Sequence, residues 1–96
     1  MEMVLNKTFD KAYSDWRDIG DCVRISTTKG DYLLNMTSSI VWKMLDGVRN
    51  GESIIDSLYE MYSDNNPKDY LEELYMESIS TMIKKGIIKE IGKEKN

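Results

Sequence analysis

The stretch that decides the fold is GDYLLNMTSSIVWKMLDG, from Gly30 to Gly47. Its first part is typical of a β-strand, and within two or three residues the apolar side chains take up the spacing of a helix. Asn35 or Thr37 lies at this change and can cap the helix by accepting a hydrogen bond from a free backbone N–H. A junction without a loop fixes the angle between a strand and a helix. This corner therefore sets the position of the helix that follows relative to the sheet.

Upstream of the junction, the sequence predicts a small antiparallel sheet of two or three strands. The β-branched, alternating run from Cys22 to Thr27 indicates one strand, and a weaker alternation from Tyr13 to Ile19 indicates another before it. The four residues TKGD, Thr28 to Asp31, are typical of a hairpin turn in which Gly30 adopts a positive φ. The segment from Asp31 to Leu34 is then the returning strand.

Downstream of the junction, residues from about 35 to 85 are expected to form three amphipathic helices, with breaks at Gly47 to Glu52 and Ser63 to Pro67. Asp46-Gly47 is expected to end the first helix, and Gly86 the third. The predicted fold class is therefore α+β: a small N-terminal antiparallel sheet followed by a three-helix bundle, in a winged helix-turn-helix-like arrangement.

The chain is short enough for one domain, which we expect to span residues 13–91. Residues 1–12 are polar with isolated apolar positions and are expected to be loosely ordered, while residues 92–96 form a tail. Ile40 and Trp42 lie on the first helix where it meets the other two, and both are expected to be largely buried.

Composition excludes several kinds of function. The chain has 96 residues and no histidine, so the core is small and neither a His-ligated zinc site nor a Ser-His or Cys-His nucleophile can form. No glycine-rich nucleotide motif is present. We therefore expect no enzyme activity and no cofactor. The single cysteine, Cys22, cannot form an internal disulfide, which indicates a cytoplasmic protein, and no apolar run approaches the ~18 residues of a membrane span.

A winged helix suggests DNA binding, but the charges oppose it. Between Glu52 and Glu77 the chain carries eight acidic residues and one basic residue, Lys68. Phosphate contacts dominate the affinity of proteins for DNA, and an acidic third helix would be repelled by them. Nucleic acid is therefore not an expected partner, and a winged-helix nucleic-acid-binding or regulatory protein is the alternative hypothesis.

The ordered segments also resemble a known family. YLLNMTSSIVWKMLDG, then ESIIDSLYEMYS, then a helix ending in MIKKGIIKEI is similar to the PqqD-like family (pyrroloquinoline quinone biosynthesis protein D), also called RiPP recognition elements. The resemblance runs from about Trp16 to Ile91. The matching residues are Leu34, Asn35, Thr37, Ile40, Trp42, Asp46, Gly47, Ile54, Ile55, Leu58, Tyr62, Met82, Gly86 and Ile87. The family often has an Asp near Leu74 and a large apolar residue near Ser78, and this chain has neither.

The resemblance implies a protein that is not an enzyme. Members of this family bind the leader segment of a ribosomally made precursor peptide and present it to a modifying enzyme, often a radical SAM maturase. In lasso-peptide systems the client is a leader peptidase. The leader adds as a strand to the small sheet, beside the last helix.

The residues themselves offer a strand and a helix face for such binding. An edge strand has backbone N–H and C=O groups that need partners, and an added peptide can supply them. The expected strand residues are Asp31, Tyr32, Leu33 and Leu34. Such a strand can also pair with the same strand of a second copy, which would give a homodimer through the sheet.

The third helix has an apolar arc that is too wide for a single contact. Its residues include Leu71, Leu74, Tyr75, Ser78 and Met82. One arrangement buries the whole arc under the protein's own sheet. In the other, the stripe formed by Leu71, Leu74, Ser78 and Met82 lines a groove beside the strand. Ser78, small and polar in the middle of the stripe, favours the groove.

Overall fold

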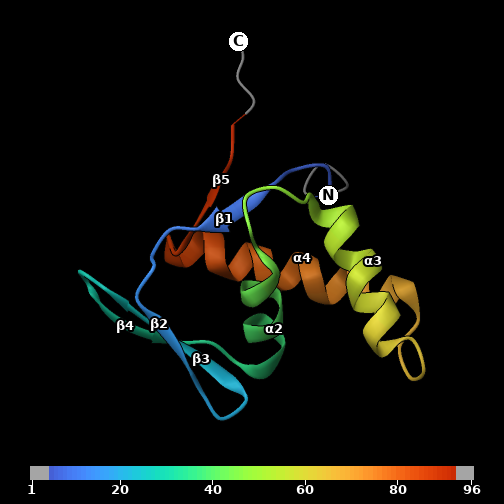
Figure 1. The fold of residues 1–96 in the computed structure, drawn as a ribbon, viewed down its shortest axis with the longest axis horizontal. Coiled ribbons are helices and arrows are strands. Elements are labelled where there is room, and N and C mark those ends of the chain that lie inside the picture. The colour runs from blue at the N-terminus through green and yellow to red at the C-terminus, as the bar shows by residue number, and fades with distance from the viewer. Residues whose placement is uncertain (1–4, 93–96) are drawn as a thin grey trace.

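The chain forms two small antiparallel sheets packed with helices, in a computed structural model that describes residues 5–92 (Figure 1). The elements are, in order, β1 (Phe9–Lys11), β2 (Trp16–Ile19), β3 (Cys22–Thr27), β4 (Gly30–Leu33), α2 (Met36–Met44), α3 (Gly51–Tyr62), α4 (Lys68–Lys85) and β5 (Ile88–Glu90). This order confirms the α+β class and the three helices expected between residues 35 and 85.

The predicted N-terminal sheet is a three-stranded meander in the order β2-β3-β4. Ile19 pairs with Cys22 and Thr27 pairs with Gly30, so each hairpin turn contains two residues. The turn between β3 and β4 consists of Thr28 and Lys29, so Gly30 begins β4 one residue earlier than expected, and its φ of 127° is positive as expected. Because β4 pairs only with β3, it lies at an edge of this sheet.

The helix boundaries follow from the capping residues. Asn35 is the cap of α2, where its side-chain oxygen accepts a hydrogen bond of 2.8 Å from the backbone N–H of Ser38. Asn50 caps α3 in the same way, accepting from Ser53 at 3.0 Å. Gly86 ends α4 in the left-handed conformation, with a φ of 71°.

The first helix ends earlier than the sequence suggested. α2 stops at Met44 rather than at Asp46-Gly47, because Leu45 turns to an extended conformation and buries its side chain in the core. Gly47 has a positive φ but is not the helix cap. Its N–H donates instead to the carbonyl oxygen of Phe9 at 3.1 Å, so the glycine allows the chain to pass close to β1.

The N-terminal segment contributes to the core, contrary to the expectation for residues 1–12. β1 pairs with β5, and Phe9 is only 3% exposed. Leu5 is buried as well. Two isolated apolar residues carry no periodicity, and the pairing joins opposite ends of the chain, so the sequence pattern did not reveal this strand. Residues 1–4 and most of the expected tail, residues 93–96, lie outside the described part.

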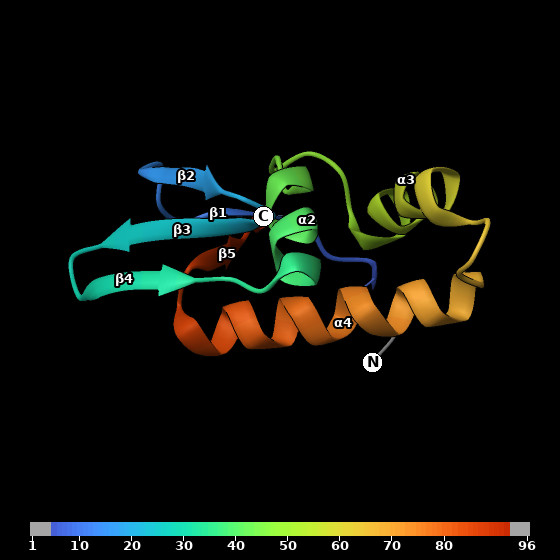
Figure 2. The same cartoon turned by 90° about the horizontal axis from the view of Figure 1, so that it is seen from below.

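α2 lies at the centre of the fold, between the sheet and α3, and packs on α4 (Figure 2). Trp42 is fully buried, as expected, while Ile40 is only partly buried. The Trp42 ring meets that of Trp16 edge to face, with 6.2 Å between ring centroids. The molecule is flat, with principal-axis extents of 41 × 37 × 19 Å.

Candidate functional site

The outer edge of β4 has unused backbone hydrogen-bonding groups. Leu34 donates its N–H to the carbonyl oxygen of Val23 at 2.9 Å. In an antiparallel pair, alternate residues direct both backbone groups toward the partner strand. The backbone N–H and C=O groups of Tyr32 therefore point toward β3, while those of Asp31 and Leu33 point away from the sheet. The site thus offers two donors and two acceptors to an incoming strand.

The side chains along this edge have different surroundings. Leu33 is 65% exposed, whereas Leu34 is buried in the core, so Leu34 contributes no side chain to this surface. The carboxylate of Asp31 accepts from Nε of Arg24 at 2.9 Å and is engaged in an ion pair. Residues 31–33, which the sequence predicted to bind a peptide, therefore form one continuous edge. This edge offers an added strand backbone hydrogen-bonding groups rather than free charges.

The C-terminal turn of α4 lies next to β4. Figure 2 shows the end of α4 on the same side of the molecule as this strand. The ammonium nitrogen of Lys85 lies 5.4 Å from the centroid of the Tyr32 ring, which is within the range of a cation–π contact. The helix and the strand are thus neighbours, as the sequence predicted.

The predicted groove along the stripe of α4 is not present. Tyr75 and Met82 are fully buried, Leu71 and Ser78 nearly so, and only Leu74 is partly accessible. The stripe is covered by α2 and α3, which both pack directly on α4. Ser78 contributes to this close approach, since its hydroxyl oxygen lies 3.2 Å from that of Ser38. A small polar residue in the stripe therefore marks a helix–helix contact and not an opening.

Ser39 holds the junction together, and the sequence analysis did not single it out. Its hydroxyl accepts the N–H of Val23 at 2.8 Å and lies 2.7 Å from the carbonyl oxygen of Asn35. The hydroxyl also lies 3.3 Å from the carbonyl oxygen of Leu34, so one buried side chain on α2 connects β3 with the segment that follows β4. A serine four residues after a cap commonly bonds to the carbonyl at that position, so a local signal was present. No local sequence signal indicated the contact between Ser39 and β3.

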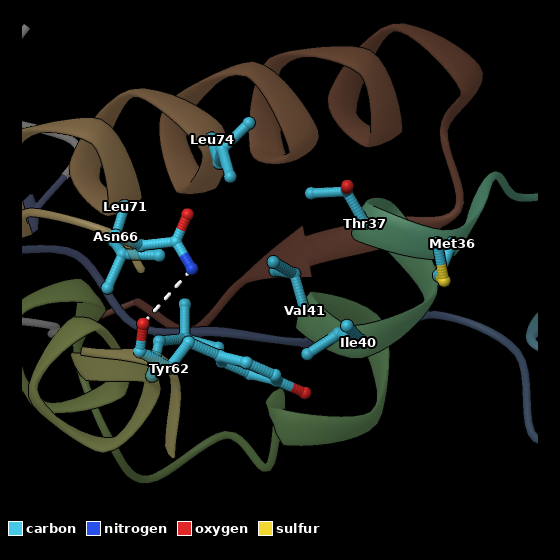
Figure 3. Close-up of a pocket in the computed structure, with 9 residues that line it drawn as sticks. Met36, Thr37, Ile40, Val41, Tyr62, Asn66, Leu71 and Leu74 are labelled. Carbon is cyan, nitrogen blue, oxygen red and sulfur yellow. Dashed lines mark hydrogen bonds between the residues drawn. The ribbon is translucent and has the colours of Figure 1, made fainter. Parts of the chain in front are cut away.

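A second surface feature is an apolar pocket between α2, α3 and α4, with a volume of about 300 Å³ (Figure 3). We call it the helix pocket. It is lined by Met36, Thr37, Ile40, Val41, Leu58, Tyr62, Asn66, Leu71 and Leu74. The side-chain N–H of Asn66 donates to the carbonyl oxygen of Tyr62 at 3.0 Å and holds the α3–α4 loop against the end of α3. Most of these residues formed no part of the predicted site.

Within residues 5–92, no group of three His, Cys, Asp or Glu side chains is placed to hold a metal ion. Burial raises the pKa of Tyr75 to about 12, so this phenol remains protonated at neutral pH. The hydroxyl of Tyr75 and the indole N–H of Trp42 are buried without a hydrogen-bond partner, in the interior rather than at the surface.

No helix in the described part of the chain is both long and apolar enough to cross a membrane. Comparisons with protein-family models, curated protein sequences and solved structures find no match to this chain. The resemblance drawn from the sequence thus rests on the pattern of residues alone.

Proposed function

We propose that this protein is a peptide-binding adaptor of the PqqD-like type, without enzyme activity, that acts in the cytoplasm. It binds the leader of a ribosomally made precursor peptide as a strand added to β4, and presents that peptide to a modifying enzyme such as a radical SAM maturase or a leader peptidase. The observation that supports the proposal most is the open edge of β4 at Asp31 and Leu33. The winged-helix-like placement of the hairpin beside the three helices is part of the same proposal.

Backbone pairing supplies the register of the bound leader. Two donors and two acceptors give up to four hydrogen bonds, each worth roughly 0.5–1.5 kcal/mol net. Part of this energy is offset by the ordering of a flexible peptide, so backbone bonds alone give weak binding. Selection among leaders then depends on side chains that meet the walls of the edge.

The wall beside the leader differs from the one that the sequence suggested. Ser78 and Met82 are buried under α2 and do not meet a bound peptide. The ring of Tyr32 and the stem of Lys85 lie at the end of α4 that flanks β4. In this proposal, leader side chains that point toward α4 pack on these two residues.

The nucleic-acid alternative gains no support from the helices. The region from Glu52 to Glu77 is strongly acidic, and its single basic residue, Lys68, is paired with Asp56 at 3.0 Å. Such a surface repels phosphates rather than collecting them.

The proposal is tested by Leu33→Pro. The N–H of Leu33 points away from β3, so proline removes a donor to the added strand and leaves the β3–β4 hydrogen bonds in place. With a synthetic leader of the precursor encoded nearest to this protein's gene, we expect binding to weaken by about tenfold or more. Leu33→Ala, which keeps the N–H, is the matched control and should bind within roughly threefold of the parent.

Amide-shift mapping with the same leader identifies the surface that binds. We expect perturbations at residues 30–34 and in the last turn of α4. Perturbations confined to α3, or equal losses of binding in Leu33→Pro and Leu33→Ala, would contradict strand addition to β4. Circular dichroism melts of both variants show whether the fold is retained.

A further inference from the structure

We propose that Lys85 determines which peptides bind at β4, and that it selects leaders with an aspartate or glutamate beside Tyr32. The inference rests on the proposed function, since it names the side-chain chemistry of the peptide that adds to β4. It concerns the face of the sheet that packs on the helices, at the point where the C-terminal turn of α4 meets β4 (Figure 2).

The position of this contact is defined by Tyr32 and Lys85. Tyr32 pairs with Ile25, which is fully buried, so the Tyr32 ring lies on the core-facing side of the sheet. The ammonium nitrogen of Lys85 lies 5.4 Å from the centroid of this ring. Neighbouring residues on adjacent strands point to the same face, with Cβ atoms about 5 Å apart. The leader residue beside Tyr32 therefore brings its side chain to the Lys85 ammonium.

The charge of Lys85 is available to such a side chain. Lys85 is exposed, and none of the ion pairs within residues 5–92 includes it. Asp31, the neighbour of Tyr32, points to the opposite face of the sheet because successive side chains of a strand alternate, and its carboxylate is paired with Arg24. A leader carboxylate beside Tyr32 thus meets a cation that has no acidic partner in the described part of the chain.

Lys84 lies on a different face of α4 and provides a matched control. Lys85 follows Ser78 by seven residues and Thr81 by four, which places these three residues on one face of the helix. Ser78 and Thr81 are uncharged, so the charge of this face near β4 comes from Lys85. Lys84 instead shares its face with Glu77, seven residues before it. The two lysines therefore carry the same charge at the same end of α4 and point in different directions.

An acidic leader residue at this position provides selection among peptides. Complementary charges at an interface mainly determine which partners are accepted and how fast they associate. A lysine or arginine at the same leader position faces the Lys85 ammonium and is disfavoured. On the opposite face of the sheet, the adjacent leader residue meets Leu33, which is 65% exposed, so we expect that residue to be apolar.

A charge exchange between Lys85 and the leader tests the proposal. The probe is the synthetic leader of the precursor encoded nearest to this protein's gene, with each acidic residue replaced in turn by lysine. Lys85→Glu should weaken binding of the unchanged leader by about tenfold, and one of the replaced leaders should restore binding to within roughly threefold of the parent pair. This restoration also shows that Lys85→Glu is folded. Lys84→Glu, the matched control, should bind the unchanged leader within about threefold of the parent.

The salt dependence separates the charge of Lys85 from its apolar stem. Lys85→Met keeps a stem over Tyr32 and removes the charge, so binding should weaken by about threefold at low ionic strength. At about 1 M NaCl the parent and Lys85→Met should bind alike, because salt screens the charge contact. A difference between them that persists at high salt would assign the effect to packing and overturn the role of the charge.

The outcomes separate this inference from the proposed function. If Leu33→Pro weakens leader binding but no replaced leader restores binding to Lys85→Glu, strand addition stands and the role of Lys85 falls. Equal losses in Lys84→Glu and Lys85→Glu, or tight binding of a leader that has no acidic residue, would also overturn it. If the leader does not bind the parent protein, or binds Leu33→Pro equally well, the proposed function falls and this inference falls with it.

Discussion

β4 and the apolar stripe of α4 were expected to form the two walls of one groove. In the structure the edge of β4 is exposed, whereas most of the stripe is buried. β4 remains open along its outer edge, with Leu33 among the most exposed apolar residues of the described chain. The stripe of α4 is closed at Ser78 and Met82, with Ser78 only 4% exposed, while Leu71 and Leu74 at its other end line the helix pocket. The difference lies in the neighbours: α2 and α3 pack on α4, whereas β4 pairs with β3 alone.

The exposure of a strand edge and the burial of a helix face have different causes. A strand at the end of a meander is an edge unless another segment covers it. A helix face, in contrast, is buried or exposed according to which neighbour packs on it. The predictions below test whether α2 is the element that separates the open edge from the closed stripe.

The largest expected effect follows Trp42→Ala. Trp42 is fully buried on α2 and contacts Trp16, so its removal leaves a cavity under the sheet. We expect the free energy of unfolding to fall by roughly 3–5 kcal/mol. Trp42→Phe should cost less, because it keeps most of the ring volume and removes an indole N–H that has no partner. Urea denaturation measures both, and an unfolding midpoint close to the parent for Trp42→Ala would show that α2 does not depend on this contact.

The next effect contrasts the stripe with the edge directly. Ser78→Arg forces a long charged side chain into the contact between α4 and Ser38, and we expect a loss of about 3 kcal/mol in unfolding free energy. Leu33→Arg makes the same kind of change at the open edge and should cost within about 0.5 kcal/mol. Similar unfolding curves for the two variants would mean that the stripe is open after all.

The smallest expected effect is at the corner itself. Asn35→Ala removes the side-chain oxygen that accepts the N–H of Ser38, and should lower stability by about 1 kcal/mol. Asn35→Asp keeps an acceptor beside the positive end of the helix dipole and should retain stability near that of the parent. A thermal melt in which the two variants behave alike would argue against a capping role for this side chain.

Local features of the fold could be predicted from the sequence. The hairpin at Gly30, the caps at Asn35 and Asn50 and the end of α4 at Gly86 each depend on a few neighbouring residues. The edge position of β4 was also within reach, because consecutive strands joined by short turns pair in order.

Features that join distant segments could not be predicted in this way. β1 was missed because its partner, β5, is almost the whole chain away and because Phe9 is a single apolar residue without a repeat. The helix pocket was missed because it needs three helices at defined angles.

The sequence by itself determined the three helices, the caps at which α2 and α3 begin, the end of α4 at Gly86, and that β4 follows β3 in the sheet. These properties come from backbone conformation and from hydrogen bonds between near neighbours. Only the tertiary structure decided which faces are covered. From the sequence Ser78 favoured a groove, but the packing of α2, held to β3 through Ser39, places Ser78 in a close helix contact. Burial depends on where a neighbour lies in space, and the pattern along one helix does not contain that position.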